Sequence, residues 1–167
     1  VAARLLDAVS GMSYPGSLEI QVLDDSTDET SAIVETKIAE LRARGVRVHH
    51  LRRLHRDGYK AGALAMGLAA SDSELFAVFD ADFVPPPGLL LAAVPRFADP
   101  EVGMVQARWD HLNRDESRLT SVQAAYLDGH FAVESDARFL SGRFFHFHCT
   151  AGIWRRAPIE DDGRGSA

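Results

Sequence analysis

Residues 75–84 read L-F-A-V-F-D-A-D-F-V, an apolar run that stops abruptly on Asp80 and Asp82. A run of about four to eight apolar residues closed by polar ones is typical of a strand buried on both faces. Because side chains two apart on an extended segment point the same way, we expect both carboxylates to emerge together at the strand's carboxyl end. Open α/β sheets bind their ligands at that edge. The run therefore predicts a strand at 75–79 with an acidic site directly after it.

A second apolar segment also ends on a pair of acids. Residues 18–23 read L-E-I-Q-V-L, and Asp24 and Asp25 follow directly. Two strands that both end in acids predict two acidic loops at the same edge of one sheet. The pair also fits an Asx turn that opens a helix, and both interpretations stay open.

The whole chain alternates strand-like and helix-like patterns. We expect strands at 18–23, 46–51, 75–79, 102–109 and 144–150, and helices at 28–44, 60–70, 88–97 and 117–139. In the last helix, four apolar side chains are expected to face inward: Leu119, Val122, Tyr126 and Val133. Successive βα units predict an α/β fold with a mainly parallel sheet and helices on both faces. No repeat or linker interrupts the pattern, so residues 1–167 are predicted to form a single domain.

Composition agrees with one globular domain that has a real core. The chain has 167 residues, of which 46% are hydrophobic and 25% charged. The net charge of −6 argues against nucleic acid as the principal partner. No apolar run approaches the length of a membrane span, about 18 residues. The chain starts at Val1 and ends in G-R-G-S-A, and we interpret both ends as cut.

Two carboxylates at one strand end suit Mg²⁺ or Mn²⁺, hard cations that in turn hold the oxygens of a diphosphate. The D-x-D pattern also fits a helix N-cap beside an ordinary solvated aspartate. A third interpretation is a phosphatase of the haloacid dehalogenase type. That class carries its motif on the first strand and a lysine downstream, whereas here the motif comes late and no lysine follows Lys60.

Five segments, taken in order, carry a more specific signal. They are D-D-S at 24–26, G-Y-K-A-G-A-L at 58–64, F-D-A-D at 79–82, V-G-M-V-Q-A-R-W at 102–109 and T-A-G-I-W-R-R at 150–156. With these segments the chain resembles the family 2 glycosyltransferases, in particular the processive, cellulose-synthase-like branch. The resemblance implies a GT-A-type, Rossmann-like fold, of which this chain would be a partial catalytic domain.

The resemblance also implies roles for single residues on the donor side. Asp24 and Asp25 would lie beside the base and ribose of a nucleotide. Lys60 and Asp80 would lie near its diphosphate, where a compact ammonium at a helix start can contact phosphate oxygens. Asp80 and Asp82 would hold Mg²⁺ or Mn²⁺, with Asp82 the stronger candidate for direct contact with the metal.

The later segments would form the acceptor and donor-sugar side of the cleft. The residues concerned are Gln106, Arg108, Trp109, Thr150, Ala151 and Gly152. Trp109 would stack on a sugar ring, although an isolated tryptophan also fits ordinary packing. His148 and Cys149 stand where the family has an Asn-Gly or Cys-Gly pair, so this chain departs from the pattern there.

The implied activity is an inverting, metal-dependent transfer of a hexose from a UDP-sugar or GDP-sugar to a polysaccharide or lipid acceptor. The catalytic base, in a T-E-D motif, is expected beyond residue 167, as are the membrane helices that would hold the full-length protein at the cytosolic face of a membrane. A non-catalytic nucleotide-sugar binding module is the main alternative. The haloacid dehalogenase-type phosphatase is less favoured.

Overall fold

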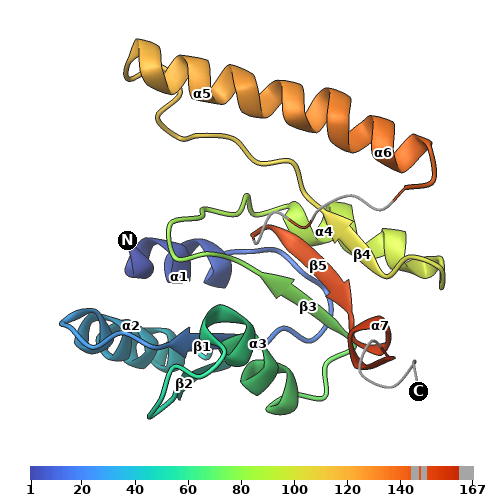
Figure 1. Ribbon diagram of the computed structural model, residues 1–167. Coiled ribbons are helices and arrows are strands. Elements are labelled where there is room, and N and C mark those ends of the chain that lie inside the picture. The colour runs from blue at the N-terminus through green and yellow to red at the C-terminus, as the bar shows by residue number, and fades with distance from the viewer. Residues whose placement is uncertain (144–146, 148–149, 162–167) are drawn as a thin grey trace.

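The computed structural model describes residues 1–143, 147 and 150–161 (Figure 1). Its strands are β1 (Ile20–Asp24), β2 (Val48–Arg52), β3 (Leu75–Val78), β4 (Met104–Gln106) and β5 (Gly152–Arg155). Its α-helices are α1 (Ala2–Ser10), α2 (Thr30–Ala43), α3 (Tyr59–Ala69), α4 (Leu89–Ala93), α5 (Arg118–Gly129), α6 (Asp136–Leu140) and α7 (Arg156–Asp161). A 3₁₀ helix, η1 (Val94–Ala98), follows α4, and a π-helix, η2 (His130–Ser135), joins α5 to α6.

The strands form one parallel and two antiparallel pairs. β1 and β2 are parallel, with Ile20 opposite Val48 and Asp24 opposite Arg52. β3 and β4 both pair antiparallel with β5, so they run in the same direction on either side of it. The α/β fold class is confirmed, and β5 is the strand that departs from the parallel arrangement. Alternation in the sequence does not reveal this reversal, because a long connection such as the one before β5 allows either direction.

One core cluster lies where α1 and α2 meet β1 and β2. Val34, Ile38 and Leu41 of α2 are buried, and their spacing places them on one face of the helix. They pack with Leu6 and with one residue from each strand, Ile20 and Val48. The helix ends before Gly45, whose φ of +83° is the left-handed conformation that glycine adopts without strain. A second cluster joins α4 and η1 to β5, through Leu90, Ala93, Phe97 and Ile153, with Met12 beside them.

The prediction that the apolar face of the helix at 117–139 points inward is wrong. Its four apolar side chains are 66–80% exposed: Leu119, Val122, Tyr126 and Val133. Figure 1 shows α5 and α6 lying apart from the strands, beyond the extended segment that follows β4. The opposite face makes the contacts, through the buried Ala124 and, in η2, Phe131. Periodicity identifies an apolar face, but it does not say what covers that face.

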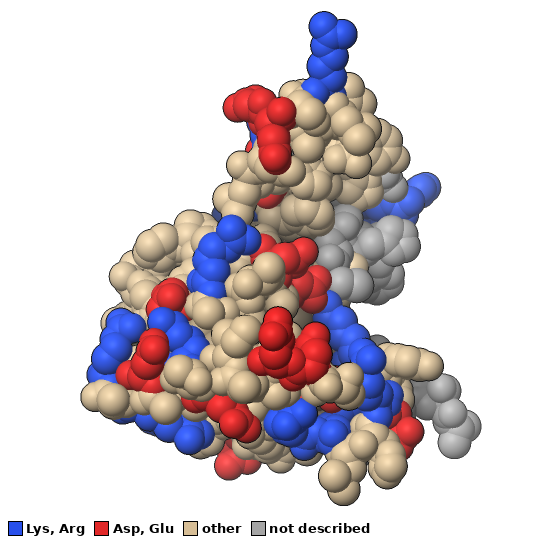
Figure 2. Space-filling view, turned by 90° about the vertical axis from the view of Figure 1, so that its left-hand side faces the viewer, with Lys and Arg blue, Asp and Glu red and all other residues tan. Residues whose placement is uncertain are grey.

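The surface of this projecting part differs from the rest. Figure 2 shows a mostly uncharged upper part, whereas many Lys, Arg, Asp and Glu side chains cover the lower part of the molecule. Among the described helices, none is both long and apolar enough to cross a membrane.

Candidate functional site

The D-D-S loop begins where β1 ends, and its first acid is buried. Asp24 is 7% exposed. Its carboxylate accepts hydrogen bonds from the Ser26 backbone N–H at 2.9 Å and from the Ser31 hydroxyl at 2.8 Å. On the neighbouring strand, Nε2 of His50 lies 3.0 Å from Asp24 Oδ2. Asp24 therefore ties β1, β2 and the start of α2 together.

These contacts decide the charge of Asp24. Burial by itself would raise the pKa of its carboxyl group, but the hydrogen bonds from Ser26, Ser31 and His50 outweigh burial and hold the pKa well below its ordinary value. The carboxylate is ionised at neutral pH, and its oxygens are committed to protein groups. The structure thus gives Asp24 a role in shaping the loop, in addition to any contact with a nucleotide.

Asp25 points to a different partner, Arg53. The guanidinium of Arg53 donates two hydrogen bonds to the Asp25 carboxylate, the one from Nε at 3.0 Å. The side-chain hydrogen bond from Arg53 is the main cause that lowers the pKa of Asp25. The sequence interpretation did not include Arg53 in the site. The one sequence feature that points to Arg53 is its position directly after β2, which places it at the same sheet edge as Asp25.

The D-A-D segment lies in a turn, not on the strand. β3 ends at Val78, and the N–H of Phe83 donates to the carbonyl oxygen of Asp80 at 3.0 Å. The rings of Phe79 and Phe83 stack across this turn, with centroids 5.6 Å apart. The expectation that Asp80 and Asp82 share a face of an extended strand is therefore wrong, because the chain has already turned. Asp82 is exposed and Asp80 is partly buried.

Lys60 and Asp80 meet, although they belong to different elements. Lys60 lies in the first turn of α3, and its Nζ contacts Asp80 Oδ1 as an ion pair. The two side chains are 45% and 39% exposed, so both charges stay accessible to solvent. α3 reaches this position by packing closely on β1, where a Cβ at Gly67 would lie within 3.1 Å of the Leu23 side chain. The structure thus brings together two residues that the resemblance assigns to the diphosphate.

Asp80 and Asp82 suit a divalent cation that takes its remaining ligands from the substrate and from water. Among the side chains that the structure describes, no group of three or more His, Cys, Asp or Glu residues is arranged to hold a metal. Mg²⁺ is commonly held by one or two carboxylates together with substrate phosphates and water. Asp80 and Asp82 fit that donor set. They suit a cation that arrives with a diphosphate rather than a pre-built metal centre.

The T-A-G segment supports the D-A-D turn. The Thr150 hydroxyl accepts a hydrogen bond from the Asp80 backbone N–H at 3.0 Å. Gln106 Nε2 donates to the Thr150 carbonyl oxygen at 3.0 Å. Ala151, with a left-handed φ of +55°, donates its N–H to the carbonyl of Val78 at 2.8 Å. Three residues expected on the sugar side of the cleft thus form a floor beneath Asp80.

Gly152 belongs to the same floor, because it begins β5 and pairs with both Val78 and Gln106. A Cβ at this position would lie within 2.9 Å of the Phe147 ring. His148 and Cys149, where the sequence departs from the family pattern, lie outside the described residues.

Arg108 and Trp109 contact the projecting helix instead. Arg108 forms an ion pair with Asp128 of α5. The ring of Trp109 packs edge-on against His111 and Phe131, with centroids 6.0 and 5.9 Å away. Its indole N–H is buried without a hydrogen-bond partner among the described residues. The structure therefore packs Arg108 against α5 and Trp109 against η2.

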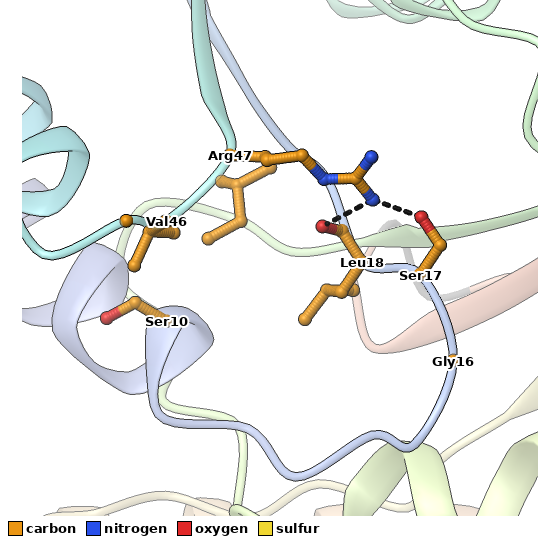
Figure 3. A pocket seen from close by; sticks show the side chains of 8 residues that line it. Ser10, Gly16, Ser17, Leu18, Val46 and Arg47 are labelled. Atoms are coloured by element: carbon orange, nitrogen blue, oxygen red, sulfur yellow. Dashed lines mark hydrogen bonds between the residues drawn. The ribbon is translucent and has the colours of Figure 1, made fainter.

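A pocket among the described residues lies away from the D-A-D turn. It has a volume of about 320 Å³ and lies at the amino ends of β1 and β2, where Arg47 donates to the Leu18 carbonyl at 3.2 Å and to the Ser17 hydroxyl (Figure 3). Asp24, at the other end of β1, does not line it. None of the residues predicted for the site lines this pocket.

Comparison with known proteins identifies the family of this chain. The sequence profile described as Glycosyl transferase family 2 matches residues 2–161. Glucomannan 4-beta-mannosyltransferase 2 from Arabidopsis thaliana is 43% identical over 164 residues, which are 95% of this chain and 31% of that protein. Glucomannan 4-beta-mannosyltransferase 1 from Cyamopsis tetragonoloba is 41% identical over the same shares of the two chains.

The chain thus spans about a third of the length of these relatives (31%). The matches decide against the haloacid dehalogenase interpretation, since the profile covers all of the segments that suggested a glycosyltransferase. The chain belongs to glycosyl transferase family 2.

Proposed function

We propose that this chain forms the donor-binding part of a hexosyltransferase that uses a UDP-sugar or GDP-sugar and Mg²⁺ or Mn²⁺. The observation that carries the proposal is the meeting of Lys60 and Asp80 directly after β3, supported by Thr150. The D-D-S loop follows β1, and α3 packs on β1 as well, so the acids and the lysine belong to neighbouring elements. The relatives' names support a mannosyl group as the hexose and a polysaccharide as the acceptor.

Transfer of the sugar releases a nucleoside diphosphate, whose negative charge must be neutralised. The ammonium of Lys60 can take up part of that charge, because its side chain is 45% exposed and lies beside Asp80 at the end of β3. A bound Mg²⁺ or Mn²⁺ would supply Lewis-acid stabilisation of the same charge, held by Asp80 and Asp82. Asp80 would then exchange its ion pair with Lys60 for the cation, while Lys60 turns to the phosphate.

Inversion at the sugar carbon would need a general base at the acceptor hydroxyl. The resemblance assigns that role to a T-E-D motif, which residues 1–167 do not contain. By the same resemblance, the full-length protein would work at the cytosolic face of a membrane. The direct test of this chain is therefore binding of the donor's nucleotide rather than turnover.

The test is calorimetric titration of the chain with GDP and with UDP, each with Mg²⁺ or Mn²⁺ and with EDTA. We expect one nucleotide to bind with metal and to bind much more weakly with EDTA. Asp82→Asn should lower the affinity about tenfold to a hundredfold, the loss expected when a hydrogen-bonded or ligating charge is removed. Asp72→Asn, an exposed acid before β3, is the matched control and should change nothing. Equal affinity with and without EDTA would contradict the metal site, and no binding of either nucleotide would contradict the proposed function.

A further inference from the structure

Arg53 joins the D-D-S loop to the segment directly before Lys60. Besides its two hydrogen bonds to Asp25, its guanidinium donates to the carbonyl oxygen of Asp57 at 2.7 Å and to that of Tyr59 at 2.8 Å. Its side chain is 11% exposed. Four hydrogen bonds from one guanidinium use most of its five N–H donors. A basic residue of a solvated loop does not make such a set of contacts.

The segment that Arg53 holds is strained. Gly58 has a φ of +68° and Tyr59 a φ of +48°, so two successive residues adopt the left-handed conformation just before Lys60. For a non-glycine residue such as Tyr59 this conformation is unfavourable and persists only where surrounding contacts fix it. The hydrogen bond from Arg53 to the Tyr59 carbonyl is a contact of that kind.

Gly62 leaves the room for this arrangement. A Cβ at Gly62 would clash with the carbonyl oxygen of Asp57 and would lie 2.6 Å from Nη1 of Arg53. The first turn of α3 can therefore close over the guanidinium only with glycine at this position. The direction in which α3 leaves the turn, and with it the position of Lys60, depends on the same packing.

We propose that Arg53 is a positioning residue for donor binding: it locks the Gly58–Tyr59 turn to the D-D-S loop and thereby places the Lys60 ammonium beside Asp80. The effect of Arg53 on donor binding rests on the proposed function, whereas its effect on the position of Lys60 does not. It also gives Asp25 a role, since the Asp25 carboxylate orients the guanidinium. Lysine cannot replace Arg53, because a single ammonium lacks the planar fork that reaches a carboxylate and two carbonyls at once.

The first experiment observes Lys60 directly. The chain has two lysines, Lys37 and Lys60, so reductive ¹³C-methylation labels two side chains that NMR can separate. Asp80→Asn shows where the Lys60 signal lies when its ion pair is lost. We expect Arg53→Gln to move the Lys60 signal towards that position and to leave the Lys37 signal unchanged. Arg56→Gln is the control, because it removes the same charge from the same loop. The Tyr59 N–H donates to the backbone carbonyl oxygen of Arg56 at 2.9 Å, and this hydrogen bond does not depend on the Arg56 side chain.

The second experiment measures the affinity for GDP and UDP in the presence of Mn²⁺. Arg53→Gln and Arg53→Lys should both weaken the binding, by no more than Lys60→Ala does, whereas Arg56→Gln should not. In a Lys60→Ala background, Arg53→Gln should add little further loss, because its effect passes through Lys60. A purely structural role would instead give losses that multiply. Urea unfolding of each variant shows whether it is folded, and Arg53→Lys serves if Arg53→Gln does not fold.

The outcomes separate this inference from the proposed function. A wild-type chain that binds neither nucleotide would contradict the function. An unchanged Lys60 signal in folded Arg53→Gln, or multiplicative losses in the double variant, would overturn the positioning role of Arg53.

Discussion

The hydroxyl of Thr150 accepts a hydrogen bond from the backbone N–H of Asp80 at 3.0 Å, across 70 residues of sequence. Thr150 is buried, and its own carbonyl oxygen accepts from the amide of Gln106. The turn that carries Asp80 and Asp82 is thus fixed from below by β4 and β5, and from the side by Lys60. This support explains how the partly exposed Asp80 carboxylate holds a defined position at the end of β3.

Thr150→Val should loosen this turn. Valine has nearly the same shape but no acceptor, so the Asp80 N–H loses its partner, at an expected cost of about 1–3 kcal/mol in the free energy of unfolding. Metal-dependent binding of GDP or UDP should weaken with it, because Asp80 is no longer held. Urea denaturation and calorimetry measure the two effects. Thr150→Ser keeps the hydroxyl and is the control; a loss as large as that of valine would show that the methyl group, and not the hydrogen bond, matters.

Asp24 should give the chain an acid-sensitive stability. Its pKa is lowered in the folded state and close to about 3.9 in the unfolded state. The unfolded chain therefore takes up the proton first as the pH falls, so the contribution of Asp24 is complete above about pH 5 and is lost as the pH drops below about 4. Urea unfolding at several pH values should show a flatter dependence over this range for Asp24→Asn than for the wild type.

The control for this measurement is Asp72→Asn, which removes an exposed acid and should keep the wild-type dependence. A pH dependence of Asp24→Asn parallel to the wild type would contradict the hydrogen-bonded, ionised Asp24.

The exposed apolar face of α5 gives a third prediction. Val122→Ser should change the free energy of unfolding by less than about 0.5 kcal/mol, since surface substitutions away from special contacts usually do. The fully buried Ala124, two residues on, is the matched contrast, and Ala124→Asp should destabilise strongly because it buries a charge without a partner. Thermal or urea unfolding decides between them. A loss of about 2 kcal/mol or more in the free energy of unfolding for Val122→Ser would instead indicate that Val122 is buried, as the sequence pattern suggests.

Much of the site follows from local sequence patterns. The strand 75–79 and the helix at 60–70 are visible as an apolar run and as a helix start near Lys60, and the family resemblance assigns both Lys60 and Asp80 to the diphosphate. The structure confirms both elements to within a residue or two. Helix α2 and its stop at Gly45 are equally local features.

The remainder depends on contacts between distant segments. Arg53 binds main-chain carbonyls of Asp57 and Tyr59, which leave no trace in residue types. Asp24 is committed to His50 because of the register between β1 and β2, which the sequence does not specify. The reversal of β5 and the outward face of α5 likewise depend on how a long connection folds back, and not on any periodicity.

Lys60 tests the account most directly, because its ammonium should meet phosphate rather than base. Lys60→Ala should lower the affinity for GDP or UDP with Mn²⁺ about tenfold to a hundredfold, and leave binding of guanosine or uridine nearly unchanged. Lys37→Ala is the control: that lysine bridges Asp7 at 2.7 Å and Glu40 at 3.0 Å, so its loss should affect stability and not nucleotide affinity.

The decisive measurement is therefore the ratio of diphosphate to nucleoside affinity in the two lysine variants, by calorimetry. The account predicts that the ratio collapses for Lys60→Ala alone. Equal ratios for Lys60→Ala, Lys37→Ala and the wild type would contradict it.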